Sequence, residues 1–273
     1  MDKNMVVNKQ DFTDMLRSFS KNLAEKITED GNWTIKGFID LYKNIYTIST
    51  DTKIISKILE IHLFPHFLHL AEEHGYRIEL ASQQNYYPDL TFIKLSDKRV
   101  KFAVDLKTTF RDAKNPNNCN GFTLGSHGEY FQDRNSAKNI QYPYSQYLGH
   151  YCFGIIYSRN TLDTINELKI FNINALATII PVIKDFTCFA EEKWKIASDK
   201  GGSGNTANIG SIKSISDLVK GNGTFAKAGE VVFDDYWMNY GKLTHVVRGK
   251  IKHITNFRDY LIYRNKSLTL LNG

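Results

Sequence analysis

Two acids and a lysine between residues 88 and 107 have the types and the spacing needed to cleave a phosphodiester. The stretch 100–107 reads VKFAVDLK, and its alternation of apolar and polar residues predicts a half-buried strand with Asp105 and Lys107 on the polar face. Carboxylate oxygens suit Mg²⁺, which keeps several waters and borrows phosphate oxygens. A lysine one pleat along could orient or deprotonate the attacking water, or offset charge on a phosphoryl transition state.

The second acid, Asp89, stands where a partner strand begins. Residues 90–95 predict a strand, a polar turn follows, and the chain returns in the strand that carries Asp105 and Lys107, so a β-hairpin is expected. In one register Asp89 shares a face with Asp105 and Lys107. A slip of one residue places it on the opposite face. The register therefore decides whether the three residues can form a site.

The acid-x-Lys spacing is not distinctive by itself. It also occurs at 51–53, 112–114 and 191–193, which we interpret as solvated surface charge. The strand setting and the Pro88-Asp89 pair set 105–107 apart. From these features alone, a catalytic site and an ordinary surface salt bridge are equally compatible with the sequence.

Composition narrows the class of protein. The 273 residues are 42% hydrophobic and 23% charged, as in globular domains. A net charge of +6 weakly favours a polyanionic partner, because clustered lysines and arginines gain affinity by releasing phosphate counterions. Cys119, Cys152 and Cys188 match no zinc spacing and suit free thiols in a reducing compartment. No stretch resembles a signal peptide or a membrane span, so a cytoplasmic location is expected.

The remaining pattern predicts alternating helices and strands without a separating linker. Phe12, Met15 and Leu16 begin a helical apolar repeat that continues to Ile27, behind Asp11 as N-cap. Further expected elements are a helix from about 50 to 74 that kinks or restarts at Pro65, a loop at 112–126, strands at 151–158 and 193–197, and helices at 231–240 and 255–263.

Six segments together resemble the EcoRV-like type II restriction endonucleases of the PD-(D/E)xK nuclease superfamily, and they occur in the same order. They are 49–53 (STDTK), 83–89 (QQNYYPD), 105–109 (DLKTT), 122–125 (FTLG), 138–140 (KNI) and 202–212 (GSGNTANIGSI). The PD…DxK signature alone is degenerate, whereas the set is specific and covers most of the chain after about residue 16.

The resemblance implies a fold, a reaction and partners. The fold would be a mixed central β-sheet flanked by helices, in a single domain over 1–273, with a dimerisation part at roughly 16–50 and 140–170 and the remainder catalytic and DNA-binding. The active form would be a homodimer on double-stranded DNA, without membrane contact. It would use Mg²⁺ to cleave a palindrome similar to GATATC, leaving blunt ends. A cognate DNA methyltransferase would belong to the same restriction system without being a physical partner.

The resemblance also assigns roles to residues. Asp89 and Asp105 would be catalytic metal ligands, Lys107 the catalytic lysine, and Glu60 a helical carboxylate that assists metal binding. The residues implied in DNA binding are Gln84, Asn85, Thr108, Thr109, Lys138, Gly202, Ser203, Gly204, Asn205 and Thr206.

Two of the implied DNA-contacting loops have a physical rationale. Glycines in 202–208 would let the backbone approach base edges, where Asn205 can pair with an adenine and Thr206 can touch a thymine methyl. Gln84 and Asn85 would lie in the minor groove, directly joined to Asp89, and so couple recognition to cleavage. Without the family, both segments would be interpreted as surface loops.

Some residues depart from the family pattern. Ala207 stands for a threonine, Tyr86 for a histidine, and 126–131 differs in length and adds Glu129, an acid that would repel a phosphate. Lys138, Arg248, Lys250 and Arg258 could hold phosphates or be ordinary solvated charges.

Three other functions fit parts of the sequence. A repair or recombination nuclease of the same fold would share the three residues without reading a sequence. A non-catalytic DNA-binding protein would bind without cleaving. A zinc protein could use His62, His66 and His69, but Pro65 interrupts their helical spacing.

Overall fold

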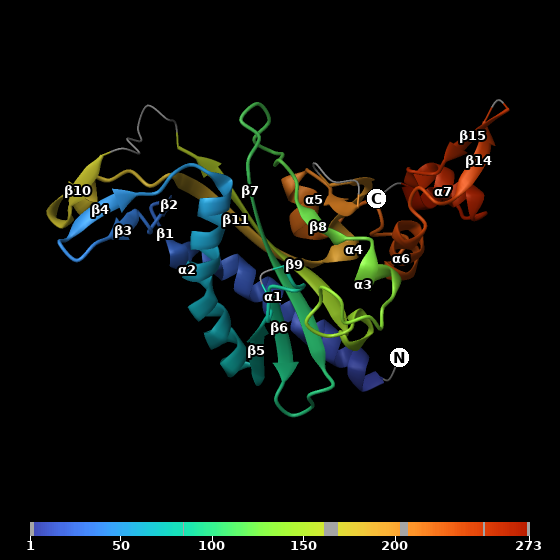
Figure 1. Ribbon diagram of the computed structural model, residues 1–273, viewed down its shortest axis with the longest axis horizontal. Coiled ribbons are helices and arrows are strands. Elements are labelled where there is room, and N and C mark those ends of the chain that lie inside the picture. The colour runs from blue at the N-terminus through green and yellow to red at the C-terminus, as the bar shows by residue number, and fades with distance from the viewer. Residues whose placement is uncertain (1–2, 84, 161–168, 203–206, 248, 272–273) are drawn as a thin grey trace.

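The centre of the molecule is a seven-stranded mixed sheet (Figure 1). The computed structural model describes residues 3–83, 85–160, 169–202, 207–247 and 249–271. The strands lie in the order β1 (Thr28–Glu29), β2 (Asn32–Trp33), β11 (Ile183–Glu192), β9 (Gly149–Arg159), β7 (Lys101–Phe110), β6 (Leu90–Lys94) and β5 (Tyr76–Leu80). All neighbours pair antiparallel except β7 and β9, which are parallel. The expected mixed sheet flanked by helices is confirmed, including the strand predicted at 151–158.

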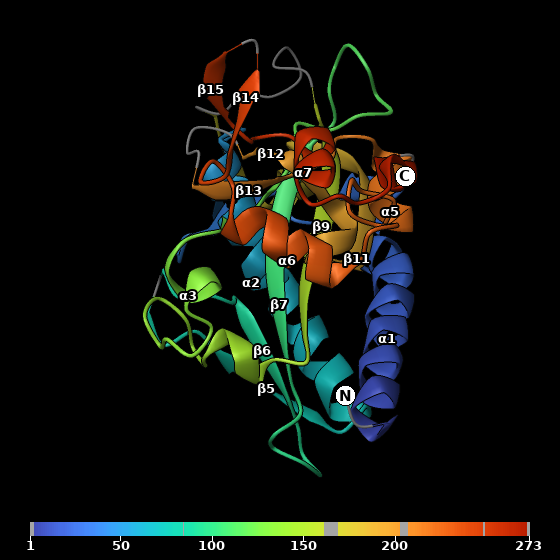
Figure 2. The same ribbon diagram turned by 90° about the vertical axis from the view of Figure 1, so that its right-hand side faces the viewer.

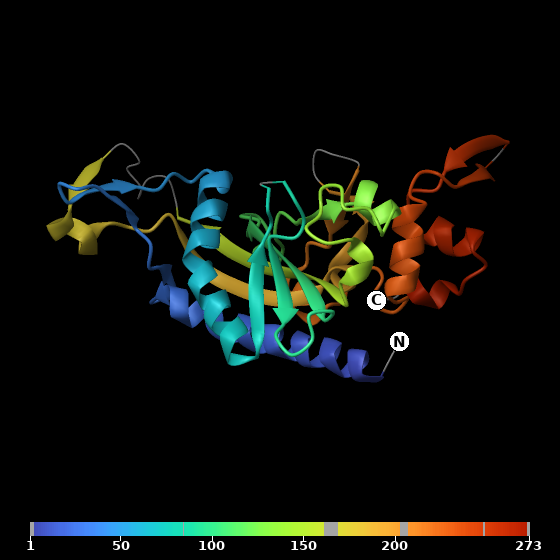
Figure 3. The ribbon, with the colours of Figure 1, turned by 60° about the horizontal axis from the view of Figure 1, so that its bottom comes forward.

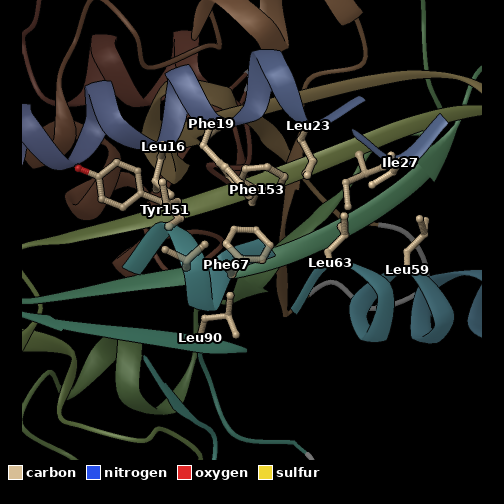
Figure 4. Packing of buried hydrophobic residues seen from close by; sticks show 14 of the residues in the cluster. Leu16, Phe19, Leu23, Ile27, Leu59, Leu63, Phe67, Leu90, Tyr151 and Phe153 are labelled. Atoms are coloured by element: carbon tan, nitrogen blue, oxygen red, sulfur yellow. The ribbon is translucent and has the colours of Figure 1, made fainter. Parts of the chain in front are cut away.

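Two long helices, α1 (Lys3–Ile27) and α2 (Thr52–Glu73), pack on one face of this sheet (Figure 3). Leu16, Phe19 and Leu23 of α1 point toward Phe67 of α2 and Phe153 of β9 (Figure 4). Burying each such side chain contributes roughly 1.5–3 kcal/mol. The predicted apolar repeat therefore forms the core face of α1.

The helix ends show which local signals were correct. Asp51 caps α2, and its side chain accepts hydrogen bonds from the backbone N–H groups of Lys53 and Ile54, so the helix begins close to the predicted residue 50. The helix runs uninterrupted through Pro65 and is followed by Gly75, whose φ of +71° favours glycine. Asp11, in contrast, is not an N-cap. The helix α1 begins eight residues earlier, so Asp11 lies inside it.

The other face of the sheet carries a second core, to which the middle of the chain and its C-terminal elements both contribute (Figure 2). A three-stranded sheet has the order β12 (Ala197–Gly201), β13 (Asn208–Ser211), β8 (Thr123–Ser126). The surrounding helices are α3 (Glu129–Gln132), η1 (Tyr144–Gln146), α4 (Lys193–Ile196), α5 (Ile215–Lys220), α6 (Glu230–Met238), α7 (Phe257–Tyr263) and η4 (Leu268–Leu271). The helices predicted at 231–240 and 255–263 are confirmed.

Two predictions in this region are wrong. Residues 193–196 form the short helix α4 rather than a strand, because the chain must turn out of the long strand β11 before it enters β12. The segment 112–126 is a loop only at first, since its last four residues form β8 and pair with β13.

Smaller units occupy the two ends of the molecule (Figure 1). At one end lies a sheet of β3 (Gly37–Ile39), β4 (Asn44–Thr47) and β10 (Ile170–Asn172), followed by the 3-10 helix η3 (Ile173–Thr178). At the other end lies the hairpin of β14 (Thr244–Val247) and β15 (Lys250–His253). Within the described residues, no helix is both long enough and apolar enough to cross a bilayer.

Candidate active site

The register of the β6–β7 hairpin places the predicted site residues on one face. Leu90 pairs with Val104 and Thr91 with Ala103, so the next position outward sets Asp89 opposite Asp105. Lys107 lies two residues further along β7 and shares the face of Asp105. Of the two possible registers, the one that places Asp89 on the same face as Asp105 and Lys107 is therefore the one that forms.

The three side chains contact one another. Lys107 Nζ lies 2.7 Å from Asp105 Oδ2 and 3.9 Å from Asp89 Oδ2. The backbone N–H of Leu106 donates a 2.7 Å hydrogen bond to Asp89 Oδ2. The two carboxyl groups also interact electrostatically with each other. Asp105 is buried, whereas 36% of the Asp89 side chain is exposed, so the site opens to solvent on the Asp89 side.

The electrostatics of the pair are asymmetric. Burial, together with the charge of Asp105, raises the pKa of Asp89 to about 7. Burial also opposes ionisation of Asp105, but the charges of Lys107 and Lys193 hold its pKa below the usual value. Although burial favours a neutral amine, Asp105 and Asp89 raise the pKa of Lys107. The free site thus holds one firmly ionised acid, one acid that is reluctant to ionise, and a charged lysine.

This donor set fits a hard divalent cation. Two neighbouring carboxylates repel each other when both are ionised, and this repulsion adds to burial in raising the pKa of Asp89. The described residues contain no group of three or more His, Cys, Asp or Glu side chains arranged to hold a metal. The protein therefore offers two carboxylates, and water and phosphate oxygens would complete a shell of the kind that Mg²⁺ prefers.

Glu60 lies apart from the pair. It is on the exposed side of α2, where Lys57 Nζ lies 2.9 Å from its Oε1. It lines a pocket of about 370 Å³ together with Thr52, Ser56 and Thr108. In the described part of the chain, no hydrogen bond or ion pair joins Glu60 to Asp89 or Asp105.

Comparison with known proteins points to the same chemistry. A family model described as restriction endonuclease EcoRV matches residues 29–265. The chain belongs to this family. The type II restriction enzyme EcoRV of Escherichia coli is 39% identical over 239 residues, which cover 87% of this chain and 94% of that enzyme. The resemblance seen in the sequence is confirmed: the chain is a type II site-specific deoxyribonuclease, and DNA is its substrate.

The predicted recognition loop of this family member is anchored at its base. The N–H of Gly202 donates to the C=O of Asn208 at 2.8 Å, and the N–H of His127 donates to the C=O of Ala207 at 2.9 Å. A Cβ on Gly202 would lie 3.1 Å from Thr123 Oγ1, so a side chain there would press on β8. The predicted base-reading residues Ser203, Gly204, Asn205 and Thr206 lie outside the described residues.

The other predicted DNA contacts occupy different environments. Asn85 is exposed in a turn closed by a hydrogen bond from Tyr86 N–H to Gln83 C=O, and Gln84 lies outside the described residues. Thr108 is partly exposed on β7, whereas Thr109 is only 5% exposed.

The remaining predicted phosphate contacts are surface charges. Lys138 is exposed, and its Nζ lies 2.9 Å from Glu129 Oε1, so its charge is compensated within the protein. Lys250 and Arg258 are exposed, and Arg248 lies outside the described residues.

The acid-x-Lys segment 191–193 is not solvated, contrary to the sequence interpretation. Glu191 accepts hydrogen bonds of 2.8 and 2.7 Å from Arg17, and Glu192 lies 2.5 Å from Lys9 Nζ, because α1 covers the end of β11. Lys193 is only 5% exposed, and burial lowers its pKa to about 8. The segments 51–53 and 112–114 are largely exposed, as expected.

Sequence reasoning therefore missed Lys193 as a neighbour of Asp105. The signal that could have revealed this burial was the position of Lys193 directly after the ten-residue strand β11, because the end of a long strand is often covered by other elements.

The histidines of α2 give no support to a zinc site among the described residues. The Trp33 Nε1–H donates to His62 Nδ1 at 3.2 Å, and His69 faces Glu73 at 3.3 Å. These contacts explain the histidines as packing and surface residues.

Proposed function

We propose that this endonuclease uses Mg²⁺ to cleave both strands of duplex DNA within a palindrome similar to GATATC, leaving blunt ends. The observation that carries the proposal is the convergence of Asp89, Asp105 and Lys107 on one face of the hairpin. Family membership supports the same reaction.

Asp89 and Asp105 would hold the cation. A divalent cation bound there would neutralise charge on the scissile phosphate and lower the pKa of an attacking water. Glu60 would act from the neighbouring pocket as an auxiliary acid rather than as a direct ligand of the same ion, because its carboxylate is engaged by Lys57.

Lys107 would stabilise negative charge on the phosphate. Its pKa is raised by Asp105 and Asp89, so the side chain stays an ammonium at neutral pH and is a poor proton acceptor. A fixed cation beside developing phosphoryl charge lowers the barrier without having to reorganise.

Sequence reading would come from two loops. Asn205 and Thr206 would contact base edges in the major groove, with Gly202, Ser203 and Gly204 allowing a close approach. Gln84 and Asn85 would enter the minor groove, and Thr108, Thr109 and Lys138 would complete the contacts with DNA. The hydrogen bonds at Gly202 and Ala207, on either side of these residues, are consistent with this proposal.

The active form would be a homodimer. The small sheet at one end exposes an apolar surface, here called the β4 face: Phe38, Ile39, Leu41, Tyr42, Tyr46, Ile170 and Leu176. Leu41 is 90% exposed and Tyr42 80% exposed, which is unusual unless another surface covers them. A second copy related by a twofold axis would place one site on each strand of a palindrome. The β4 face lies partly within the dimerisation part proposed at roughly 16–50 and 140–170, and Leu176 extends it beyond residue 170. The remainder of the single domain would be catalytic and DNA-binding.

Digestion of DNA of known sequence tests the proposal. With Mg²⁺, the wild-type protein should give discrete fragments whose mapped ends are flush and share one palindrome, and Asp105→Asn should give none. Random degradation would favour a repair nuclease. Binding without cleavage, unaffected by Asp105→Asn, would favour a non-catalytic protein. Methylating the mapped palindrome should protect it if a cognate methyltransferase completes the system.

A further inference from the structure

Lys193 is a buried cation that no ion pair explains. It is the first residue of α4, directly after β11, and is only 5% exposed. Within the described residues no carboxylate forms an ion pair with it, while Glu191 and Glu192 beside it pair with Arg17 and Lys9 of α1. Burying an ammonium is costly unless nearby charge compensates it. The compensating charge must therefore act over a longer distance.

The neighbours of Lys193 identify that charge. Its Nζ lies 4.0 Å from the centroid of the Tyr87 ring. A Cβ on Gly125 would lie 3.1 Å from the same Nζ, so the ammonium is enclosed between Tyr87 and β8. The acids that interact with it electrostatically are Asp105 and, more weakly, Asp89. The ammonium is thus buried against the ring of Tyr87, two residues before Asp89, where it interacts electrostatically with both acids.

Tyr87, whose ring contacts the Lys193 ammonium, is held by hydrogen bonds of both its backbone and its hydroxyl group. The N–H of Tyr87 donates to the C=O of Asn139 at 3.1 Å, and its C=O accepts from the N–H of Gln141 at 2.8 Å. The Tyr87 hydroxyl is 3.0 Å from Nδ1 of the buried His150. Since Tyr87 is two residues from Asp89, the ammonium and the acid are held in a fixed relation.

The charges of this centre balance without a metal. Asp89 and Asp105 contribute two negative charges when ionised, and Lys107 and Lys193 contribute two positive charges. A divalent cation alone would leave the centre strongly positive in a poorly solvated place. A scissile phosphodiester brings the negative charge that relieves this excess.

We propose that Lys193 is a positioning residue that supplies a fixed counter-charge near Asp105, so that the centre binds a divalent cation weakly until a phosphodiester is present. This inference rests on the proposed roles of Asp89 and Asp105 as metal ligands. It deepens that proposal, because a fixed positive charge explains how the enzyme keeps two adjacent carboxylates close together in the absence of DNA.

Removing the charge has an effect of definite sign. The loss of one neighbouring positive charge favours binding of a divalent cation about twice as much as binding of a proton, because the cation carries twice the charge. Metal binding should therefore tighten even where protons compete for the two acids. A lysine with only a packing role would do the opposite, because its loss would loosen the pair and weaken metal binding. The direction of the change in affinity therefore separates the two roles.

The test is titration of the DNA-free enzyme with Mn²⁺ by isothermal calorimetry at about pH 7, which is below the pKa of about 8 of Lys193, so that its side chain is charged. Lys193→Met removes the charge and keeps the length, and Lys193→Arg keeps the charge. Lys195→Met is the matched control: it makes the same change in net charge two residues away, where the side chain is 25% exposed and pairs with Glu192 at 3.2 Å.

The inference predicts that Lys193→Met binds Mn²⁺ about tenfold or more tightly than the wild type, while Lys193→Arg and Lys195→Met stay within about threefold. Unchanged or weaker binding by a folded Lys193→Met, or equal tightening by Lys193→Arg, would overturn it. If Lys193→Met does not unfold cooperatively, Lys193→Gln is judged by the same criterion. Asp105→Asn distinguishes the failures: if it binds Mn²⁺ like the wild type, the proposed metal ligands are wrong. If it loses binding while Lys193→Met changes nothing, only the role of Lys193 is wrong.

Discussion

The backbone N–H of Leu106 donates a 2.7 Å hydrogen bond to Oδ2 of Asp89. Leu106 lies between Asp105 and Lys107 in β7, so the strand that carries two of the site residues also orients the third. Asp89 is thereby held by main-chain geometry, which does not depend on the rotamer of any other side chain. The site is formed once the hairpin is in register, before any ligand arrives.

Asp89→Asn tests whether the charge of this acid, rather than its hydrogen bond, is needed. The amide oxygen of Asn can still accept from Leu106, so the local structure should persist while a metal ligand is lost. We expect single-turnover cleavage to fall by roughly 10²–10³-fold or more, while DNA affinity changes by only a few fold. The control is Asp97→Asn, in the turn of the same hairpin, whose acid pairs with the exposed Arg99. Equal losses in both variants would show that the charge of Asp89 has no special role.

Asp89 also makes stability depend on pH in a direction that can be worked out. Its pKa is about 7 in the folded protein and near 3.9 in an unfolded chain, so folding favours the protonated form. The stability that this acid contributes is present below about pH 4 and is lost as the pH rises through about 7. Asp89→Asn, which mimics the protonated acid, should therefore stabilise the metal-free protein increasingly over this range.

The expected gain is about 1 kcal/mol at about pH 8, because water screens the 36% of the side chain that is exposed. Urea unfolding in a chelator at about pH 5 and about pH 8 measures it. A gain that is the same at both values, or larger at the acidic one, would contradict the assignment.

How much of this site the sequence could predict depends on how local each signal is. Asp51 was recognisable as a cap because its partners, the N–H groups of residues 53 and 54, follow it directly. The alternation in 100–107 was enough to predict β7. Its register was not, because that depends on how the turn closes: Lys94 N–H donates to Val100 C=O, and Val100 N–H donates to Asp97 C=O.

Lys193 is an example of what a local sequence pattern cannot predict. The letters EEK suggest a solvated end, but contacts with α1 bury Glu191 and Glu192, and Tyr87 and β8 enclose Lys193. Arg17 and Glu191 are 174 positions apart, so no periodicity in either segment reveals the pair. The same holds for α1, which precedes the part of the chain that matches the family model and still covers the strand leading to α4.

Glu60→Gln tests whether Glu60 contributes less to cleavage than the Asp89–Asp105 pair does. Because Lys57 engages Glu60 at an exposed site, removing its charge should disturb the Asp89–Asp105 pair little. We expect cleavage to fall by less than about tenfold, compared with the much larger loss for Asp89→Asn. Single-turnover rates at saturating Mg²⁺ provide the comparison, with Glu73→Gln near the end of α2 as control. A loss as large as that of Asp89→Asn would make Glu60 a direct participant and would require α2 to approach the pair when DNA binds.

Leu41→Asp tests the proposed homodimer through the β4 face. Leu41 is 90% exposed in the turn between β3 and β4, and a charge there would be buried unpaired if a second copy packs on it. We expect the chain of 31.4 kDa to shift from dimer to monomer in light scattering coupled to size exclusion. Double-strand cleavage should fall with it, because a lone subunit presents one site to a palindrome. Val231→Asp, at an 81% exposed position of α6, provides the control for an added surface charge. If both variants dimerise equally, the β4 face is not the interface. If the wild type is already a monomer, the proposed dimer is wrong and the second strand must be cut in a separate encounter.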